Sequence, residues 1–287
     1  MPIPMHRPTM YHRPSNVNGL EYAICIGLGD NLVIRVYFDS IKHNYDQIRI
    51  SHNKNVISSC RNGDVKYKQF LDELGTLLFS EPPYIFDHGN YPEIQRVDTI
   101  MNLANKPRKP NLDHLLCKGE SLNLDEEYIV ITTKIRCLPR STYNSISSQF
   151  WQTMRNLATR YKIVVMGERV VEVSPEYTGQ QDTIFGIYDD VIQNVPKDRL
   201  IDLTVPALGI VSPDLSKIQQ DCLIMKEAKV VITLAIGGNF FLALSVANTI
   251  CYRVDDDITI DLLSNPDFPT LFATKNFQEF INKLERT

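Results

Sequence analysis

Two segments that read strand, glycine turn and helix, one near each end of the chain, constrain the fold more than any other feature. In the first, the apolar run 23–26 is broken at residues 27–30, and apolar residues resume at helical spacing from Asn31 onward. In the second, the run 230–234 leads to a glycine turn and then to an apolar, helix-like segment. Such turns place backbone N–H groups at the carboxyl ends of strands, where open α/β sheets bind ligands. The pattern predicts two halves, each with the strand–turn–helix fold of nucleotide-binding domains, that face one cleft.

Strands and helices alternate along the rest of the chain, which predicts an α/β fold with parallel sheets and helices on both faces. The expected strands are residues 22–26, 47–51, 84–86, 128–132, 162–166, 200–203 and 230–234. The expected helices are residues 30–44, 65–79, 213–227, 240–248 and 277–284. A further helix is expected to be capped by Ser145 and to carry Ile146, Phe150, Met154 and Leu157 on one face.

The length of 287 residues exceeds that of a usual single domain, so two domains are expected. Residues 1–18 are rich in Pro, His and Arg and are predicted to form a loose arm. An N-terminal domain is expected at 19–110. Residues 111–125 contain few periodic apolar side chains and follow a basic, proline-containing run, which indicates a linker. A C-terminal domain is expected at 126–287.

Charge, cysteines and apolar segments limit the kinds of partner and compartment. A net charge of -4 gives no basic field, so nucleic acid is not an expected partner. The 6 cysteines form no Cys-x-x-Cys pair, and most lie in apolar runs, which predicts buried, reduced thiols in a cytoplasmic protein. The N-terminal arm lacks the apolar core of a signal peptide. Residues 230–252 carry no charge, but the glycine turn interrupts them, which favours a buried strand, turn and helix over a membrane span.

Two other kinds of site are disfavoured. Gly27 and Gly29 suggest a dinucleotide fingerprint, but Leu32 stands where the third glycine is needed. No acidic residue closes the second strand to hold a ribose, which argues against an NAD enzyme. The acidic run 255–257 has no partner histidines and is interpreted as a solvated turn, so no metal is expected.

Two groups of polar residues follow expected strands in a way that suits catalysis. Asp30 lies at a helix start, where it is either a cap or a catalytic base. Thr132 and Thr133 end the strand that opens the second half, and two cations, Lys134 and Arg136, come directly after them. Two hydroxyls and two cations suit a diphosphate, although a solvated loop is the ordinary alternative.

Two further turns offer groups that could hold a nucleotide. Gly167 ends a strand and is followed by carboxylates that could bind a ribose diol or simply belong to a surface turn. The second glycine turn precedes an apolar helix, so it is either an anion site or a tight turn that needs positive φ. The candidate residues of these two turns are Gly167, Glu168, Glu172, Gly237, Gly238 and Asn239.

Taken together, these segments resemble the heptosyltransferase-like glycosyltransferases, which share the GT-B fold. The resemblance runs from about residue 23 to about residue 253. It rests on the order of six segments: residues 26–30, 129–134, 164–168, 200–204, 215–228 and 230–247. At the final turn the family usually has Asp-x-Gly-Pro and then His, whereas residues 236–240 of this chain read Ile-Gly-Gly-Asn-Phe.

The resemblance implies two Rossmann-like, parallel-sheet domains that face a central cleft. It makes residues 19–110 the acceptor-side domain and residues 126–287 the nucleotide-sugar-binding domain. It also implies transfer of a sugar from a nucleotide diphosphate-sugar to a hydroxyl acceptor, with inversion and without a metal or other cofactor. Asp30 would be the general base, and Lys134 and Arg136 would offset the charge on the departing diphosphate. The residues implied to contact the donor are Gly29, Thr132, Thr133, Gly167, Glu168, Glu172, Gly237, Gly238 and Asn239.

Other functions stay open at this point. A nucleotide-sugar epimerase can share the fold and the donor pocket. A catalytically inactive nucleotide-sugar-binding module is also compatible with the altered final turn. A metal-dependent transferase that uses residues 255–257 is the least favoured. The sequence identifies neither the sugar, the nucleotide, the acceptor nor the oligomeric state.

Overall fold

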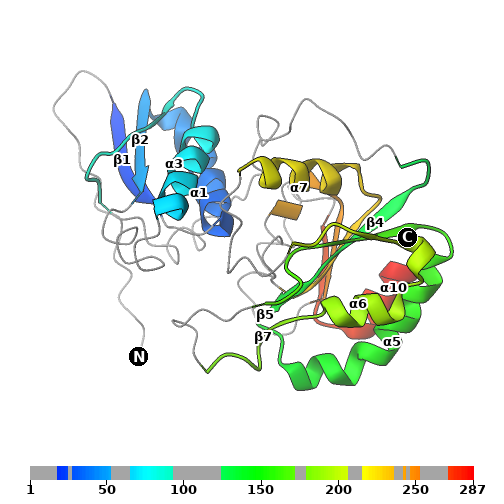
Figure 1. Cartoon of the computed structure of the whole chain (residues 1–287). Helices are drawn as coiled ribbons and strands as arrows, with labels where there is room; N and C mark the ends of the chain where they lie inside the picture. The colour runs from blue at the N-terminus through cyan, green and yellow to red at the C-terminus, as the bar shows by residue number, and fades with distance from the viewer. Residues whose placement is uncertain are drawn as a thin grey trace. The chain divides into compact units, whose positions relative to one another are not determined.

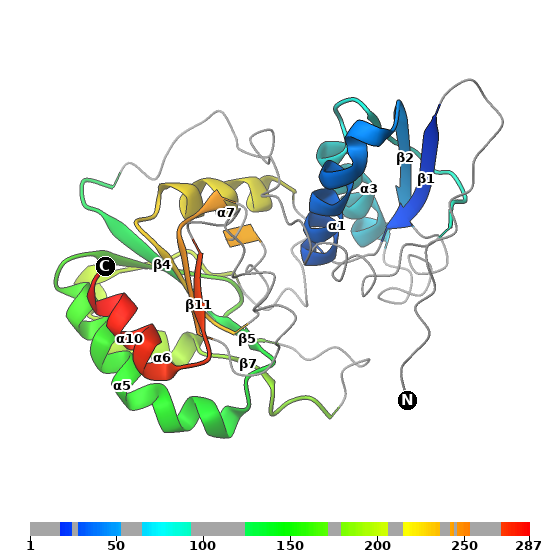
Figure 2. The same ribbon diagram turned by 180° about the vertical axis from the view of Figure 1, so that it is seen from behind.

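The computed structural model describes residues 18–24, 28–52, 65–92, 124–171, 179–205, 215–235, 242–243, 246–252 and 271–287. The chain forms two compact units (Figures 1 and 2). Unit 1 contains the described residues up to 92, and unit 2 contains those from 124 onward apart from Leu215. The predicted arm up to residue 17 and the predicted linker up to residue 123 lie outside the described residues.

Unit 1 has a three-stranded parallel sheet in the order β1-β2-β3. The strands are β1 (Gly19–Ile24), β2 (Gln47–His52) and β3 (Tyr84–Phe86). The helices α1 (Leu28–Ile41) and α3 (Val65–Leu78) lie on one side of this sheet (Figure 2), and a 3₁₀ turn at Lys42–Asn44 follows α1. The expected strands and helices of this half are confirmed, with ends that differ by a few residues.

A buried arginine joins the elements of unit 1. Arg35 on α1 is fully buried, and its Nε donates to Asp39 Oδ2 at 3.0 Å. The same guanidinium donates to the Leu78 carbonyl at the end of α3 and to Glu81 Oε1. Tyr84 at the start of β3 donates its hydroxyl to Asp39 Oδ1 at 2.7 Å, and its ring centroid lies 4.6 Å from the guanidinium carbon. One cation therefore ties α1, the end of α3 and β3 together.

Unit 2 has a six-stranded, all-parallel sheet in the order β11-β10-β9-β4-β6-β8. Its strands are β4 (Tyr128–Thr132), β6 (Lys162–Met166), β8 (Leu200–Asp202), β9 (Val231–Leu234), β10 (Thr249–Tyr252) and β11 (Leu271–Thr274). Numbered along the sequence within this sheet and read from β8 to β11, the order is 3-2-1-4-5-6, that of the Rossmann dinucleotide fold. The direction of winding reverses between β4 and β9.

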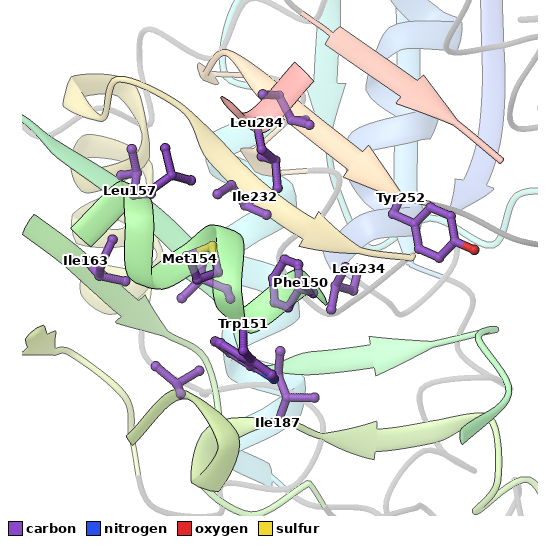
Figure 3. Packing of buried hydrophobic residues seen from close by; sticks show 14 of the residues in the cluster. Phe150, Trp151, Met154, Leu157, Ile163, Ile187, Ile232, Leu234, Tyr252 and Leu284 are labelled. Atoms are coloured by element: carbon purple, nitrogen blue, oxygen red, sulfur yellow. The ribbon is translucent and has the colours of Figure 1, made fainter. Parts of the chain in front are cut away.

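Helices cover the sheet of unit 2 on both faces. The helices α5 (Arg140–Ala158), α6 (Tyr188–Asn194) and α10 (Phe277–Glu285) gather on one side, and α7 (Leu215–Glu227) lies on the other (Figures 1 and 2). Figure 3 shows the main core, where Phe150 and Met154 of α5 lie near Ile232 and Leu234 of β9. All five residues of β4 are buried, as expected for a central parallel strand covered on both faces.

A short antiparallel ribbon leaves the carboxyl edge of this sheet. It pairs β5 (Lys134–Arg136) with β7 (Ile184–Gly186), and it brings Lys134 opposite Gly186. The sequence did not predict these strands, nor the helix α6 that follows β7, because each is too short to show a period. A 3₁₀ turn at Lys197–Arg199 then leads into β8.

One helix start was predicted wrongly. The helix α5 begins at Arg140, directly after Pro139, and Ser145 lies inside it. The Ser145 hydroxyl donates to the Thr142 carbonyl at 2.7 Å and caps nothing. Tyr143 is buried and extends the apolar face by one turn toward the N-terminus, which explains the earlier start.

The uncharged stretch 230–252 contains two buried strands, β9 and β10, and the first of these confirms the expected buried strand. Neither β10 nor β11 was predicted. Among the described residues, no helix is both long and apolar enough to cross a membrane. Of the three described cysteines, Cys222 and Cys251 are buried as expected, whereas Cys137 is exposed, and none of the three is in a disulfide.

Candidate functional site

The carboxyl ends of β4 and β9 lie where the strand order of unit 2 reverses. In open α/β sheets, ligands bind outside the strand ends at such a reversal. Ala235, which follows β9, is fully buried and has a φ of 63°. Positive φ is uncommon for a residue with a side chain and is found mostly in turns and at functional sites. The unusual backbone conformation of Ala235 therefore lies at the reversal of strand order, the position at which this topology favours a ligand.

Two threonines occupy neighbouring positions at this reversal. The register pairs Ile131 with Ile232, so Thr132 on β4 lies beside Thr233 on β9. Both threonines are buried, and neither Oγ1 makes a hydrogen bond within the described part of the chain. They face away from α5, because the alternating Ile131 and Ile232 belong to the core beneath that helix.

A buried hydroxyl without a partner costs about 1–3 kcal/mol, so two neighbouring ones are suited to bind oxygen atoms of a ligand. The sequence predicted Thr132 as a site residue but missed Thr233. Thr233 can be recognised only from the register of β9 against β4. The sequence does not show that these two strands are neighbours in the sheet.

Thr133 and Gly167 form the joint between β4 and β6. The Thr133 hydroxyl donates to the Glu168 carbonyl at 2.8 Å, and its N–H donates to the Met166 carbonyl at 2.9 Å. Gly167 has a φ of 105°, and a Cβ added there would lie 2.6 Å from Thr133 Oγ1. The single hydroxyl proton of Thr133 is already donated, so this threonine fixes the turn. The hydroxyl proton of Thr132, in contrast, has no acceptor among the described residues.

The predicted cations lie on β5, next to this joint. Lys134 and Arg136 share one face of the ribbon, opposite the buried Ile135. The Lys134 ammonium lies 3.8 Å from Glu168 Oε2, and both side chains are mostly buried. The sequence assigned Lys134 to a diphosphate and Glu168 to a ribose. The structure pairs them, so each orients the other at the edge of the sheet.

A hydrogen-bonded cluster that the sequence missed lies beside Glu168, at the end of β8. Asp202 accepts from the Thr204 N–H at 2.9 Å, from the Tyr188 hydroxyl at 2.8 Å and from Arg169 Nη2 at 3.1 Å. Burial alone would raise the pKa of Asp202, but these hydrogen bonds and the charge of Arg169 lower it below its ordinary value. The carboxylate is held ionised, and the cluster fastens the end of β8 to β6 and α6.

The predicted base lies in unit 1, in the first turn of α1. This helix begins at Leu28, so Gly29 and Asp30 are its second and third residues rather than a preceding turn. The helix macrodipole favours a negative charge in a first turn. The side chain of Asp30 lies outside the described part of the structure.

A histidine–carboxylate pair, not expected from the sequence, lies at the end of β2. His52 Nδ1 is 3.4 Å from Asp72 Oδ1 on α3, and the His52 side chain is only 2% exposed. The sequence showed histidines scattered singly, because His52 and Asp72 meet only through the packing of α3 on β2.

Several predicted residues lie outside the described part of the chain: Glu172, Gly237, Gly238 and Asn239, together with the acidic run 255–257. Among the described residues, no three His, Cys, Asp or Glu side chains are grouped so that they could hold a metal ion.

Comparison with solved structures supports the fold. The chain is similar to the bacterial iron-containing dodecameric glycosyltransferase TibC from enterotoxigenic E. coli H10407, with a TM-score of 0.53 and 13% sequence identity over 95% of this chain and 77% of TibC. It is also similar to the glycosyl transferase family 9 protein from Veillonella parvula DSM 2008, with a TM-score of 0.47 and 9% identity over 94% of this chain and 93% of that one. The expected resemblance to heptosyltransferase-like proteins is thus confirmed at the level of the α/β, GT-B-type fold.

A second TibC structure, in complex with ADP-D-β-D-heptose, matches with a TM-score of 0.48 and 14% identity over 91% of this chain. In that comparison the chain spans 62% of the length of TibC. No family model matches the sequence, and no curated protein matches it either.

Proposed function

We propose that this chain is a glycosyltransferase that moves a sugar from a nucleotide diphosphate-sugar to a hydroxyl acceptor. The single observation that carries the proposal is the pair of buried hydroxyls of Thr132 and Thr233 at the reversal of a 3-2-1-4-5-6 sheet. Neither hydroxyl has a hydrogen-bond partner among the residues that the structure describes. Lys134 follows Thr132 by two residues in the chain. Ammonium and hydroxyl groups are both donors that phosphate oxygens accept from. The fold shared with TibC, a glycosyltransferase, agrees with this assignment.

Each donor-side residue has a chemical task in this proposal. Thr132 donates its hydroxyl proton to a diphosphate oxygen, and Thr133 and Gly167 hold the turn that presents it. Lys134 and Arg136 offset the negative charge that develops on the departing diphosphate, a task that a metal ion performs in other transferases. Glu168 or Glu172 accepts hydrogen bonds from the ribose diol. Backbone N–H groups of residues 237–239 complete the phosphate contacts.

On the acceptor side, Asp30 is the proposed general base. Its carboxylate takes the proton of the acceptor hydroxyl as that oxygen attacks the anomeric carbon. The bond from the anomeric carbon to the diphosphate oxygen breaks, and its electron pair leaves with the diphosphate. A single displacement of this kind inverts the anomeric centre and needs no metal. Because a first-turn position lowers the basicity of a carboxylate, orientation of the acceptor supplies much of the rate.

A thermal-shift screen of the full chain against nucleoside diphosphates and their sugars, with and without magnesium, tests the donor site. ADP-heptose belongs in this panel because TibC has been crystallised with it. A donor at about 100 times its dissociation constant should stabilise the fold by about 2.7 kcal/mol. Equal stabilisation with and without magnesium is the expected result. Stabilisation by NAD alone would overturn the proposal.

Product analysis with the stabilising donor then separates the transferase from its two alternatives. A transferase releases nucleoside diphosphate at a rate that rises with acceptor, and proton NMR shows an inverted anomeric centre in the product. An epimerase converts the donor without any acceptor. A binding module shows the thermal shift but no turnover, and Asp30→Ala then changes nothing.

A further inference from the structure

The backbone around Glu168, just beyond the end of β6, is held by hydrogen bonds from two directions. Glu168 forms an isolated parallel bridge with Val205, which follows β8. The Val205 N–H donates to the Gly167 carbonyl at 3.0 Å, and the Arg169 N–H donates to the Val205 carbonyl at 3.0 Å. The Glu168 carbonyl also accepts the Thr133 hydroxyl at 2.8 Å. The segments that follow β4 and β8 therefore fix the backbone of Glu168 together.

The side chain of the next residue, Arg169, is held by a ring of hydrogen bonds around Asp202. Asp202 Oδ1 accepts from the N–H and from the hydroxyl of Thr204. Asp202 Oδ2 accepts from Arg169 Nη2 at 3.1 Å and from the Tyr188 hydroxyl at 2.8 Å. Arg169 Nε donates to Thr204 Oγ1 at 2.9 Å, which closes the ring. The guanidinium carbon also lies 5.6 Å from the centroid of the Tyr188 ring, so three side chains orient this cation.

The exposure of this ring indicates that its main effect is on orientation rather than on stability. The Asp202 and Arg169 side chains are 25% and 46% exposed. An ion pair this exposed usually contributes little to the stability of a fold. Four hydrogen bonds to one carboxylate nevertheless restrict where that carboxylate and its partners lie.

Glu168 and Arg169 lie where a Rossmann fold recognises the ribose of a nucleotide. In that fold a carboxylate bonds the ribose 2′-hydroxyl, or a nearby arginine accommodates a 2′-phosphate. The strand β6 is the second in the 3-2-1-4-5-6 order, and both residues follow its end within three positions. Arg169 donates to Asp202 and Thr204 instead, which leaves Glu168 as the residue of this pair that is suited to a ribose.

We propose that Asp202 is a positioning residue, which acts through Arg169 to hold the Glu168 carboxylate toward the ribose hydroxyls of the bound nucleotide. This inference rests on the proposed function, and it assigns the ribose to Glu168 rather than to Glu172. Asp202 also keeps the Arg169 guanidinium directed toward the end of β8. Loss of Asp202 should therefore change recognition of the ribose and leave the contacts to the phosphates intact.

The test compares ribonucleotides with their 2′-deoxy counterparts, which differ only in one hydroxyl group. The probes are ADP, UDP and GDP with the corresponding 2′-deoxy diphosphates, and titration calorimetry of the full chain measures each dissociation constant. The ratio of the two constants for one base is the ribose preference. In the wild type the preference should be about tenfold for the nucleotide that binds, the loss expected for one hydrogen bond to a charged group.

Asp202→Asn separates positioning from a merely structural role. In this variant the ribose preference should fall toward one, while the affinity for the 2′-deoxy nucleotide stays close to that of the wild type. A purely structural role would instead weaken binding of both nucleotides equally and keep the preference. Glu168→Gln should also lower the preference toward one, and adding Asp202→Asn should lower it no further, because the two residues act as a unit.

Two further variants complete the comparison. Tyr188→Phe removes one hydrogen bond of Asp202 and keeps the ion pair, so it should lower the ribose preference by a smaller factor even where Asp202→Asn does not fold. The control is Asp190→Asn, which changes the carboxylate that accepts from the Tyr143 hydroxyl at 2.6 Å. It alters a tyrosine–carboxylate bond of the same kind and should leave the preference unchanged.

The inference is overturned if Asp202→Asn keeps the ribose preference of the wild type. It is also overturned if the wild type binds the ribose and 2′-deoxy forms equally, a result that leaves nucleotide binding and the proposed function standing. Absence of binding by all three ribonucleotides would reject the proposed function itself, and this inference with it.

Discussion

Adjacent threonines at the end of β4 have different chemical states, although they look equivalent in the sequence. Thr133 donates its hydroxyl proton to the Glu168 carbonyl, whereas the Thr132 hydroxyl is buried without a partner in the described chain. If the Thr132 hydroxyl forms its hydrogen bond only with the donor, it lowers the stability of the unliganded protein and raises the affinity for the donor. Removing this hydroxyl should therefore stabilise the fold and weaken donor binding.

Thr132→Val is the variant that reveals this signature. Valine has nearly the same shape but no hydroxyl, so it removes an unsatisfied buried group from the free protein. We expect an unchanged or raised Tm and a donor dissociation constant that increases about 5- to 30-fold, equivalent to about 1–2 kcal/mol. Thermal unfolding with and without nucleoside diphosphate measures both quantities.

The control for this variant is Thr153→Val, which changes a buried threonine of α5 in the same way. It should leave donor affinity unchanged. A Thr132→Val protein that loses stability and keeps its affinity would show that the hydroxyl serves the fold.

His52 should make stability depend on pH in a defined window. Its pKa is lowered from 6.5 to about 4 in the folded chain, chiefly by burial. Between these values the unfolded chain binds more protons than the folded one, so the free energy of unfolding rises with pH across the window. The loss on acidification from 6.5 to 4 has an upper limit of about 3 kcal/mol. Urea unfolding of the wild type and of His52→Gln at several pH values measures it.

Carboxylates titrate in both proteins. The difference between their free energies of unfolding at each pH therefore gives the contribution of His52 alone. The wild type should lose more stability than His52→Gln as the pH falls through this window. Parallel curves for the two proteins would contradict a neutral, buried His52.

For single residues, the sequence predicted site residues that lie at the end of a strand. It missed residues that are far apart in the chain and come together only in the fold. Thr132, Lys134 and Glu168 were found because each follows an apolar run. Thr233 lies within a run, and its importance comes from the register of β9 against β4. Asp72 lies 20 residues from His52, on a helix whose rotation no local pattern fixes.

The joint between β4 and β6 depends on a glycine for two separable reasons. Gly167 has a φ of 105°, and an added Cβ would lie 2.6 Å from Thr133 Oγ1. Gly179 has a φ of 94°, but among the described residues, its two chain neighbours aside, no atom lies within 4 Å of an added Cβ. Gly167→Ala should therefore cost more than Gly179→Ala, for which backbone strain of about 1–3 kcal/mol is the only expected cost. Urea unfolding of both variants gives the comparison.

An alanine side chain at residue 167 should push Thr133 away from its position. We therefore expect Gly167→Ala to weaken donor binding and Gly179→Ala to bind the donor normally. Equal losses of stability in the two variants would mean that the close contact with Thr133 is relieved at no cost.

The α1–α3–β3 junction of unit 1 depends on Arg35. Its guanidinium is fully buried and bonded to Asp39, and the Asp39 side chain is only 10% exposed. Arg35→Met would leave that carboxylate with Lys42 and Tyr84 as its remaining partners. Removing one member of a buried ion pair typically costs about 3–5 kcal/mol, and we expect the lower end because Lys42 remains.

Chemical denaturation monitored by signals from unit 1 measures this loss. The matched control is Lys229→Met in unit 2, which breaks the exposed pair with Glu127 and should cost less than about 1 kcal/mol. Similar losses for the two variants would show that Arg35 contributes no more than a surface charge.

Helices with an apolar pattern that repeats over more than one turn could be predicted from the sequence, whereas strands of three or four residues could not. The helices α3 and α10 were found with nearly correct ends because their apolar stripes extend over several turns. The strands β5 and β7 have three residues each. The strand β10 directly follows the expected helix 240–248, where no further strand was predicted. The start of α5 was misplaced because Ser145 is a good cap in isolation, whereas Pro139 and the buried Tyr143 set the boundary.

On the scale of the whole molecule, the sheet order decides where a nucleotide should bind. Alternating strands and helices predicted parallel sheets, but they did not predict that six strands of unit 2 take the order 3-2-1-4-5-6. That order depends on which strands pair across long stretches of chain. It places the reversal at β4 and β9, and unit 1, with its simple order β1-β2-β3, has no such reversal among its described strands.

This difference between the units predicts where a nucleoside diphosphate protects the backbone from hydrogen exchange. ADP should slow exchange in peptides that cover 131–137 and 231–235, because in the proposed function its phosphates contact Thr132 and Lys134 and so stabilise the strand ends. Peptides that cover 47–52 and 84–92 of unit 1 should exchange at the same rate with and without ADP. Mass spectrometry of the full chain measures both regions in one sample, and a non-binding nucleoside such as adenosine is the control for stacking alone. Protection that falls mainly on unit 1 would move the donor site to the sheet that contains His52. It would then make the acceptor, rather than the nucleotide, the ligand expected at the Thr132–Thr233 pair.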